Sequence, residues 1–286
     1  MLQWRNITIE DRKFIEEYLG FSDQLSYVYF FGSLYLWKDY FKTQLAEEDN
    51  TLYIKLSEGY LFPLGADSKQ AASSLLESFD TSFCFVDEKE KAVLESLFPC
   101  EIEVASNRNR ESYIYSIDDL SNLPGSKYQE ERRKVHKFQR DYEGYSFGLL
   151  GEEDILQCEK LYSLWKAEKE ITSEDEAMNL AFTHRKELDL MFFGLKYEGK
   201  LIAFDVSELS YDGKMVDLHF EKADYSYKNV YAALRFELAN YIKTTFPKVE
   251  YINYEDDFGV PGLRNWKTQY HPCIMWPSYV ATRRAK

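Results

Sequence analysis

The chain has 286 residues, of which 45% are hydrophobic and 17% aromatic, and its formal net charge at pH 7 is −14. This length and apolar content predict one or two folded domains and exclude an intrinsically disordered chain. The strong negative charge argues against general DNA binding and against docking on anionic lipid surfaces.

The sequence predicts a cytoplasmic protein without a transmembrane segment. No stretch reaches the about 18 to 20 apolar residues that a membrane span needs. The nearest, YVYFFGSLYLW at 27–37, is short and holds Gly32 and Ser33, which favours a core helix. The N-terminus lacks the pattern of a secretory signal. The scattered cysteines fit a reducing compartment and form no zinc motif: Cys84, Cys100, Cys158 and Cys273.

The first half of the chain predicts helices followed by mixed strands and helices. Thr8 and Asp11 open a helix that runs to about Tyr18, and an aromatic helix follows over about 25–45. The next elements are a hairpin over 51–65 that turns near 57–59, a helix over 68–79, a strand over 81–86, a helix over 87–98 with Asp87 as its cap and Glu90 at its third position, and strands over 101–105 and 111–117.

Turn-forming residues gather in DDLSNLPG at 118–125, where we expect the boundary between two domains, 1–120 and 121–286. The second half begins with a strand over 145–151 and a helix over 154–170. Ser173 and Glu176 form a capping box for a second helix. The later elements are a hairpin around Glu198-Gly199, a strand over 214–223, a helix over 228–246, a strand over 249–255, a helix over 261–270 and a final edge strand over 272–282 that contains Pro277.

This order, strand, two helices, three strands, helix, strand, helix and strand, resembles that of the GNAT acyltransferase fold. The first half repeats the same plan in shortened form. The resemblance implies an α/β chain of two tandem GNAT-like domains, each a mixed, mostly antiparallel sheet flanked by helices. The first domain would be degenerate, and the second would hold the active site.

The GNAT resemblance implies a donor site where two parallel strands separate and the next helix begins, because helix N-termini bind anions. The turn YKNVY at 227–231 occupies that place. Lys228, Asn229 and Val230 are therefore candidate donor-binding residues. Glycines that would let a phosphate approach the backbone are missing from this turn. Their absence favours the alternative of a non-catalytic ligand-binding protein that retains the fold.

Three residues are candidate catalytic groups. Glu221 ends a strand beside the expected gap and could accept a proton from an amine, or simply pair with a nearby cation. Glu255 lies in the acidic end of YINYEDD and could bind or deprotonate an amine. Tyr270 could protonate a leaving group or only pack. His219 is interpreted as a core histidine, and no histidine has metal-ligand spacing, so we expect no metal site.

Two segments of this acidic chain are rich in cations. Positions 125–140 hold six cations against two acids, and positions 262–286 hold five cations and no acid. Such runs are usually solvated faces, but these two could meet around a polyanion such as the phosphates of coenzyme A or a tRNA end. Lys127, Arg264 and Lys267 are therefore added to the candidate donor-binding residues.

The run GLRNWKTQYHPCIMWPSYVA resembles the C-terminal domain of phosphatidylglycerol lysyltransferases. Other segments, among them LYLWKDYF, HFEKAD and YINYEDDFGVPG, resemble a bacterial family named for that domain, so the resemblance covers nearly the full chain. Ser278 stands where lysyltransferases tend to carry a basic residue. The matching positions are Gly262, Leu263, Trp266, Lys267, Tyr270, Pro272, Trp276, Tyr279 and Val280.

The resemblance implies an acyltransferase that moves an aminoacyl or acyl group to an amine or hydroxyl acceptor. The donor would be an aminoacyl-tRNA, held by its acceptor end, or an acyl-CoA, with no tightly bound cofactor. The partners would be this small-molecule acyl donor and the acceptor, without DNA. Direct attack on the donor needs no protein nucleophile, only proximity and charge stabilisation.

Overall fold

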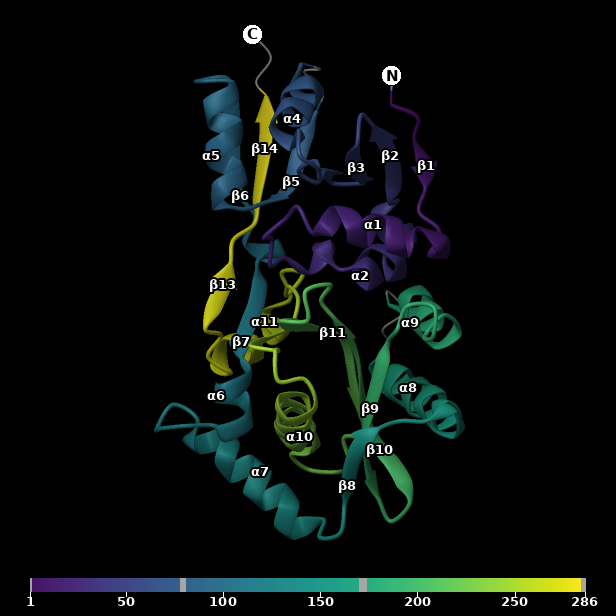
Figure 1. The fold of residues 1–286 in the computed structure, drawn as a ribbon. Coiled ribbons are helices and arrows are strands. Elements are labelled where there is room, and N and C mark those ends of the chain that lie inside the picture. Colours follow the sequence, from purple (N-terminus) through teal and green to yellow (C-terminus); the bar gives the residue numbers. More distant parts are fainter. Residues whose placement is uncertain (1, 78–80, 170–173, 284–286) are drawn as a thin grey trace. The chain divides into compact units, whose positions relative to one another are not determined.

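The computed structural model describes residues 2–77, 81–169 and 174–283, and the chain divides into two compact units. Unit 1 comprises Met1–Tyr113, Glu255–Trp266 and Met275–Lys286, and unit 2 comprises Ile114–Tyr254 and Lys267–Ile274. Both units combine a mixed sheet with helices (Figure 1). These units are not contiguous, unlike the division at 120/121 made from turn-forming residues, because C-terminal segments return to unit 1.

Unit 1 is built around a seven-stranded sheet of order β1-β2-β3-β4-β5-β14-β6. Its strands are β1 (Arg5–Asn6), β2 (Gln44–Glu48), β3 (Thr51–Leu56), β4 (Gly59–Tyr60), β5 (Ser82–Val86), β6 (Ile102–Ser106) and β14 (Tyr279–Arg283). Its helices are η1 (Ile9–Asp11), α1 (Arg12–Leu19), η2 (Tyr27–Tyr29), α2 (Phe31–Leu36), α3 (Lys38–Phe41), α4 (Ser68–Leu76), α5 (Glu88–Leu97) and η3 (Arg108–Arg110).

The last strand of the chain completes the sheet of unit 1. β14 pairs antiparallel with β5 on one side and with β6 on the other, and Ala281 is fully buried in the core of this unit. The prediction of a single final strand at a sheet edge is therefore wrong. Pro277 falls between β13 (Ile274–Trp276) and β14, so its missing N–H removes no ladder hydrogen bond.

The prediction of one aromatic helix over 25–45 is also wrong. The apolar run becomes three short helices, η2, α2 and α3, and α2 is buried along its whole length, as expected for a core helix. Lys42 has a φ of 52°, in the left-handed region, and ends α3. Residues 44–48 then pair with β3 as a strand, because tertiary pairing overrides helix propensity there.

The predicted cap of α5 is confirmed. The Asp87 carboxylate accepts a hydrogen bond from the Glu90 amide at 2.8 Å, and the Glu90 side chain accepts one from the Asp87 amide at 3.2 Å. Two amides without a partner inside the helix are satisfied in this way.

We expect the Asp87→Ala variant to lose about 1 kcal/mol of unfolding free energy, because the cap acceptor is removed. Denaturant unfolding of full-length protein measures this loss. Asp87→Asn, which keeps an acceptor oxygen, should lose less. Equal losses in the two variants would show that the cap hydrogen bond does not stabilise α5.

Unit 2 is built around a second sheet, of order β13-β7-β12-β11-β10-β9-β8. Its strands are β7 (Ser112–Ser116), β8 (Ser146–Leu149), β9 (Met191–Tyr197), β10 (Lys200–Leu209), β11 (Met215–Ala223), β12 (Tyr251–Asn253) and β13. Its helices are α6 (Ile117–Asn122), α7 (Gln129–Asp141), η4 (Glu152–Asp154), α8 (Ile155–Lys169), α9 (Asp175–Thr183) and α10 (Val230–Thr245), and α11 (Pro261–Gln269) runs across the boundary between the units.

From β8 to α11, the element order predicted for the second half is confirmed, but α7 before it was not predicted. The β9–β10 hairpin turns at Glu198-Gly199, where both residues have positive φ, and Gly199 supplies the conformation at no steric cost. Ser173, the predicted cap of the second helix, lies outside the described residues. Among the described residues, no helix is both long and apolar enough to cross a bilayer.

The two units share one plan. Each sheet contains one parallel pair, β4–β5 in unit 1 and β11–β12 in unit 2, with a helix between the paired strands in the chain. In each sheet an antiparallel strand from a distant part of the chain follows this pair, β14 beside β5 and β7 beside β12. This arrangement is the tandem GNAT-like fold.

Candidate active site

The site begins where β11 and β12 stop pairing. Their parallel register covers three residue pairs and ends at Asp217 and Asn253, although β11 continues to Ala223. The remaining part of β11 stays paired with β10 on its other side. Beyond Asp217, β11 thus has no ladder partner on the β12 side among the described residues, and we call this part the open end of β11. The GNAT resemblance implies the donor site at this position.

A buried ion pair lies on this part of β11. The Glu221 carboxylate accepts hydrogen bonds from the Arg235 guanidinium of α10, with Nε contacts of 2.9 and 3.0 Å and an Nη2 contact of 2.6 Å. Both side chains are largely buried. A guanidinium bound this way is held in a fixed orientation, because its planar donors match a carboxylate.

Tyrosines surround the cation of this pair. The ring of Tyr270 lies 4.9 Å from the Arg235 guanidinium carbon, and the ring of Tyr231 lies 5.4 Å from it. Tyr254, the first residue after β12, is buried and is influenced by the charges of Glu221 and Arg235. Burial raises the pKa of the Tyr254 and Tyr270 hydroxyls, so both stay protonated near neutral pH and can donate hydrogen bonds.

Asp205 on β10 stands directly opposite Glu221 in the ladder. Its side chain is fully buried and accepts a hydrogen bond from the Ser207 hydroxyl at 3.0 Å. Burial, and then the nearby charge of Glu221, raise the pKa of Asp205 well above its usual value. The raised pKa favours the protonated, neutral form of Asp205, and the opposite charges of Glu221 and Arg235 form an ion pair.

This protonation makes stability fall as pH rises. Above about pH 4 the unfolded chain ionises Asp205 while the folded chain keeps its proton, so the folded state is increasingly disfavoured up to its raised pKa. In Asp205→Asn the side chain is neutral in both states. We expect the ratio of its folding equilibrium constant to that of the unchanged protein to rise with pH from about pH 4 up to the raised pKa of folded Asp205, by at most about tenfold per pH unit.

Denaturant unfolding at several pH values measures this ratio. Asp118→Asn, at an exposed carboxylate of the same unit, is the control and should show a constant ratio. A constant ratio for Asp205→Asn as well would mean that Asp205 is ionised in the folded protein.

The candidate cations of unit 2 do not gather at one place. The buried Lys267 ammonium donates to the Tyr254 carbonyl, which lies just outside the ladder because β12 ends at Asn253. Lys127 pairs with Asp119 at 2.9 Å. Lys228 is exposed, and no carboxylate among the described residues pairs with it.

The turn before α10 is closed by aromatic side chains. The Lys228 amide donates to the Tyr142 hydroxyl at 3.0 Å, and Asn229 has a φ of 64° at the helix cap. Val230 is buried in the core. Tyr142, Tyr197 and Tyr227 pack against one another with ring centroids 5.3–6.2 Å apart. Of the three candidate residues here, only Lys228 has an exposed side chain.

Two candidate residues belong to unit 1 instead. Arg264 binds Asp257 at 2.8 Å and Asn109 at 2.7 Å. Burial alone would raise the pKa of Asp257, but hydrogen bonds from Arg264 and Tyr113 lower it to about 2. Glu255 is buried with a φ of 54°. Arg264 and Lys267 are three residues apart on α11, but Arg264 makes its contacts in unit 1 and Lys267 in unit 2.

Sequence reasoning missed Arg235, Asp205 and Tyr254. A signal was present for two of them, because Asp205 interrupts an apolar strand and Arg235 lies among Ala and Leu in α10. A charged residue inside an apolar run needs a buried partner. His219 is buried beside Asp217 and Glu208, at 3.4 and 3.3 Å.

Comparison with solved structures shows extensive likeness. A conserved protein of unknown function from Bacteroides thetaiotaomicron VPI-5482 is 28% identical, with a TM-score of 0.90, covering 99% of this chain and 100% of that one. The structure of L-PGS from Bacillus licheniformis is 16% identical with a TM-score of 0.69, covering 96% of this chain and 93% of that one.

A C-terminal domain (DUF2156) assigned to a lysylphosphatidylglycerol synthetase from Agrobacterium fabrum is 13% identical with a TM-score of 0.69, covering 96% of this chain and 92% of that one. At these identities, the likeness to the last two structures is one of fold. No curated protein matches the chain. The model of the family described as "Phosphatidylglycerol lysyltransferase, C-terminal" matches residues 21–282. The chain therefore belongs to this family and has its GNAT-like acyltransferase fold.

Proposed function

We propose that unit 2 transfers an aminoacyl group from an ester donor, such as an aminoacyl-tRNA, to an amine or hydroxyl acceptor. The observation that carries this proposal is the Glu221–Arg235 pair with its protonated tyrosines at the open end of β11. Family membership and the names of the relatives support the reaction class.

The cluster supplies what acyl transfer requires. Attack on the ester carbonyl places negative charge on its oxygen, and a fixed cation with neutral donors stabilises that charge in a buried site. Arg235 is the cation, oriented by Glu221. Tyr254 is the neutral donor. Because burial keeps both ions out of water, their fields act strongly on a bound carbonyl.

The proton balance assigns the two remaining roles. A bond forms between the acceptor nitrogen or oxygen and the carbonyl carbon, and the ester C–O bond breaks. Glu221 takes the proton of the nucleophile, and the Tyr270 hydroxyl protonates the leaving oxygen. Return of the proton from Glu221 to Tyr270 restores the starting state.

The closed turn before α10 favours an ester donor over acyl-CoA. A pyrophosphate at this helix would need free backbone amides, but the Lys228 amide already donates to Tyr142. The tyrosine rings at this turn, with exposed Lys228 beside them, instead suit stacking and phosphate contacts of a single-stranded tRNA end.

Mass spectrometry of the products tests the proposal. The protein is incubated with lysyl-tRNA or acetyl-CoA, each with either phosphatidylglycerol micelles or a panel of free amines. We expect an acylated acceptor with lysyl-tRNA and none with acetyl-CoA. Product with acetyl-CoA but not with lysyl-tRNA would refute the assigned donor. No product with either donor would refute the proposed reaction with these acceptors.

A second candidate is a binding protein without turnover. The observation that favours it is the engagement of both Glu221 oxygens by Arg235, which opposes proton transfer to this carboxylate. In the same experiment, this candidate predicts saturable lysyl-tRNA binding, measured by filter retention, without any acylated product.

A further inference from the structure

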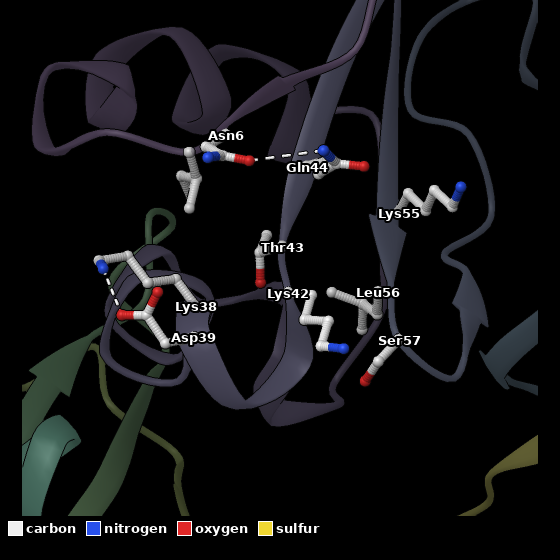
Figure 2. A pocket seen from close by; sticks show the side chains of 10 residues that line it. Asn6, Lys38, Asp39, Lys42, Thr43, Gln44, Lys55, Leu56 and Ser57 are labelled. Carbon is white, nitrogen blue, oxygen red and sulfur yellow. Dashed lines mark hydrogen bonds and ion pairs between the residues drawn. The ribbon is translucent and has the colours of Figure 1, made fainter.

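Unit 1 contains a pocket of about 650 Å³ that the proposed reaction does not use. It lies where α3 meets the ends of β1, β2 and β3, and all its lining residues belong to unit 1 (Figure 2). Its volume is within the range of about 300–1,000 Å³ that small-molecule sites occupy. A small organic ligand would therefore fit.

The charge of this pocket is opposite to that of the whole chain. Three lysines line it, Lys38, Lys42 and Lys55, against one acid, Asp39. The ammonium of Lys38 is paired with Asp39, as Figure 2 shows, so these two charges cancel. Two positive charges remain on a protein whose formal net charge is −14.

The two remaining lysines are available to an anion. Among the described residues, no carboxylate forms an ion pair with Lys42, which is exposed. The Lys55 ammonium lies 5.9 Å from the ring centre of Trp4 and 5.7 Å from that of Tyr60. Ring faces attract a cation weakly and leave its charge uncompensated.

Neutral hydrogen-bonding groups line the same space. They are the Ser57 hydroxyl and the amides of Asn6 and Gln44, which are bonded to each other at 3.4 Å. The Thr43 hydroxyl also lines the pocket but donates to the Leu34 carbonyl at 3.4 Å. The Ser57 amide donates to the Phe41 carbonyl, which fixes Ser57 beside Lys42 in the fold. An anion with several acceptor oxygens would match these donors better than a single carboxylate would.

The end of α3 does not repel an anion here. Carbonyls at a helix C-terminus carry partial negative charge. The Lys38 carbonyl accepts from the Thr43 amide at 2.9 Å, and the Phe41 carbonyl accepts from the Ser57 amide. α3 has only four residues, so its dipole is small beside two full positive charges.

We propose that this pocket binds a small phosphate-bearing molecule. Lys42 and Lys55 compensate the phosphate charge, the Ser57 hydroxyl and the Asn6 amide donate to its oxygens, and Ile7 and Leu56 contact the organic part. A phosphate carries about −1.5 to −2 charges at pH 7, which matches the two lysines. This pocket shares no residue with the proposed transfer site, because its lining residues all belong to unit 1.

Isothermal titration of the full-length protein at low salt tests the proposal. The probes are ribose 5-phosphate, adenosine 5′-monophosphate and inorganic phosphate, with ribose and adenosine as matched neutral probes. We expect at least one organic phosphate to bind at least tenfold more tightly than its neutral counterpart. Lys42→Gln should weaken that binding about tenfold, and Lys55→Gln should weaken it less.

Lys69→Gln, an exposed lysine of unit 1 outside the pocket, is the control for loss of one charge and should leave binding unchanged. Ser57→Asp, which adds a negative charge at the pocket, should abolish binding without a change in circular dichroism. Equal weakening in Lys42→Gln and Lys69→Gln, or no phosphate-dependent binding at all, would overturn the proposal. These titrations require no turnover, so they are independent of transfer activity.

Discussion

Replacement of Arg235 by Gln is expected to lower the rate of acyl transfer about 10²–10³-fold, as removal of one oxyanion-stabilising donor does in other enzymes. The Arg235 guanidinium carbon lies 4.9 Å from the ring of Tyr270, and Glu221 fixes the orientation of the guanidinium. The measurement compares kcat/KM of the Arg235→Gln variant with kcat/KM of the unchanged protein, both with lysyl-tRNA. Lys243→Gln, on the exposed face of the same helix, should leave it unchanged.

Folding must be separated from chemistry in this comparison. Arg235→Gln leaves Glu221 largely buried without its cation, and breaking a buried pair typically costs about 3–5 kcal/mol. The double variant Arg235→Gln/Glu221→Gln removes both charges and should be more stable than the single variant. We expect it to be equally inactive. Recovery of transfer in the double variant would show that Arg235 only neutralises Glu221.

Replacement of Arg110 by Met is expected to destabilise unit 1 by about 3–5 kcal/mol, because it leaves buried acids without their cation. The Arg110 guanidinium binds Asp256 at 3.1 Å and also pairs with Glu58. The Tyr27 hydroxyl donates to the same Asp256 carboxylate at 2.8 Å. The ring of Phe258 lies 4.7 Å from the guanidinium carbon and shields it from water.

Denaturant unfolding, followed by a probe specific to unit 1, measures this loss. Arg12→Met breaks a pair with Glu16 on a helix surface and should cost less than about 1 kcal/mol. A cost for Arg110→Met no larger than that for Arg12→Met would contradict the assigned role of the buried cluster.

Local patterns in the sequence predicted most elements but not their long-range pairing. The Asp87–Glu90 cap and the Glu198-Gly199 turn depend on neighbouring residues, so the sequence alone was sufficient there. β14 could not be placed, because its pairing with β5 and β6 joins residues about two hundred positions apart. The aromatic run over 25–45 was misread for the same reason, since β2 is a strand only through β3.

For the candidate site, the sequence indicated a place in the fold but not the residues that gather there. Glu221 was chosen as a candidate for its place at a strand end, and the structure places it two residues before the end of β11. Its partner Arg235 lies fourteen residues away on a helix face that periodicity alone assigns to the core. Lys267 was expected to face a polyanion, yet its ammonium donates to the Tyr254 carbonyl. A buried carbonyl needs a hydrogen-bond donor, and no sequence pattern shows which carbonyls lack one.

The central claim is that the acyl carbonyl is bound at the open end of β11. A crystal structure of the full chain with a non-hydrolysable analogue, an aminoacyl adenosine joined through a 3′-amide, tests it most directly. We expect the analogue's carbonyl oxygen within about 3 Å of an Arg235 or Tyr254 donor. An analogue seated elsewhere, with the Glu221–Arg235 pair and both tyrosines untouched, would contradict the claim.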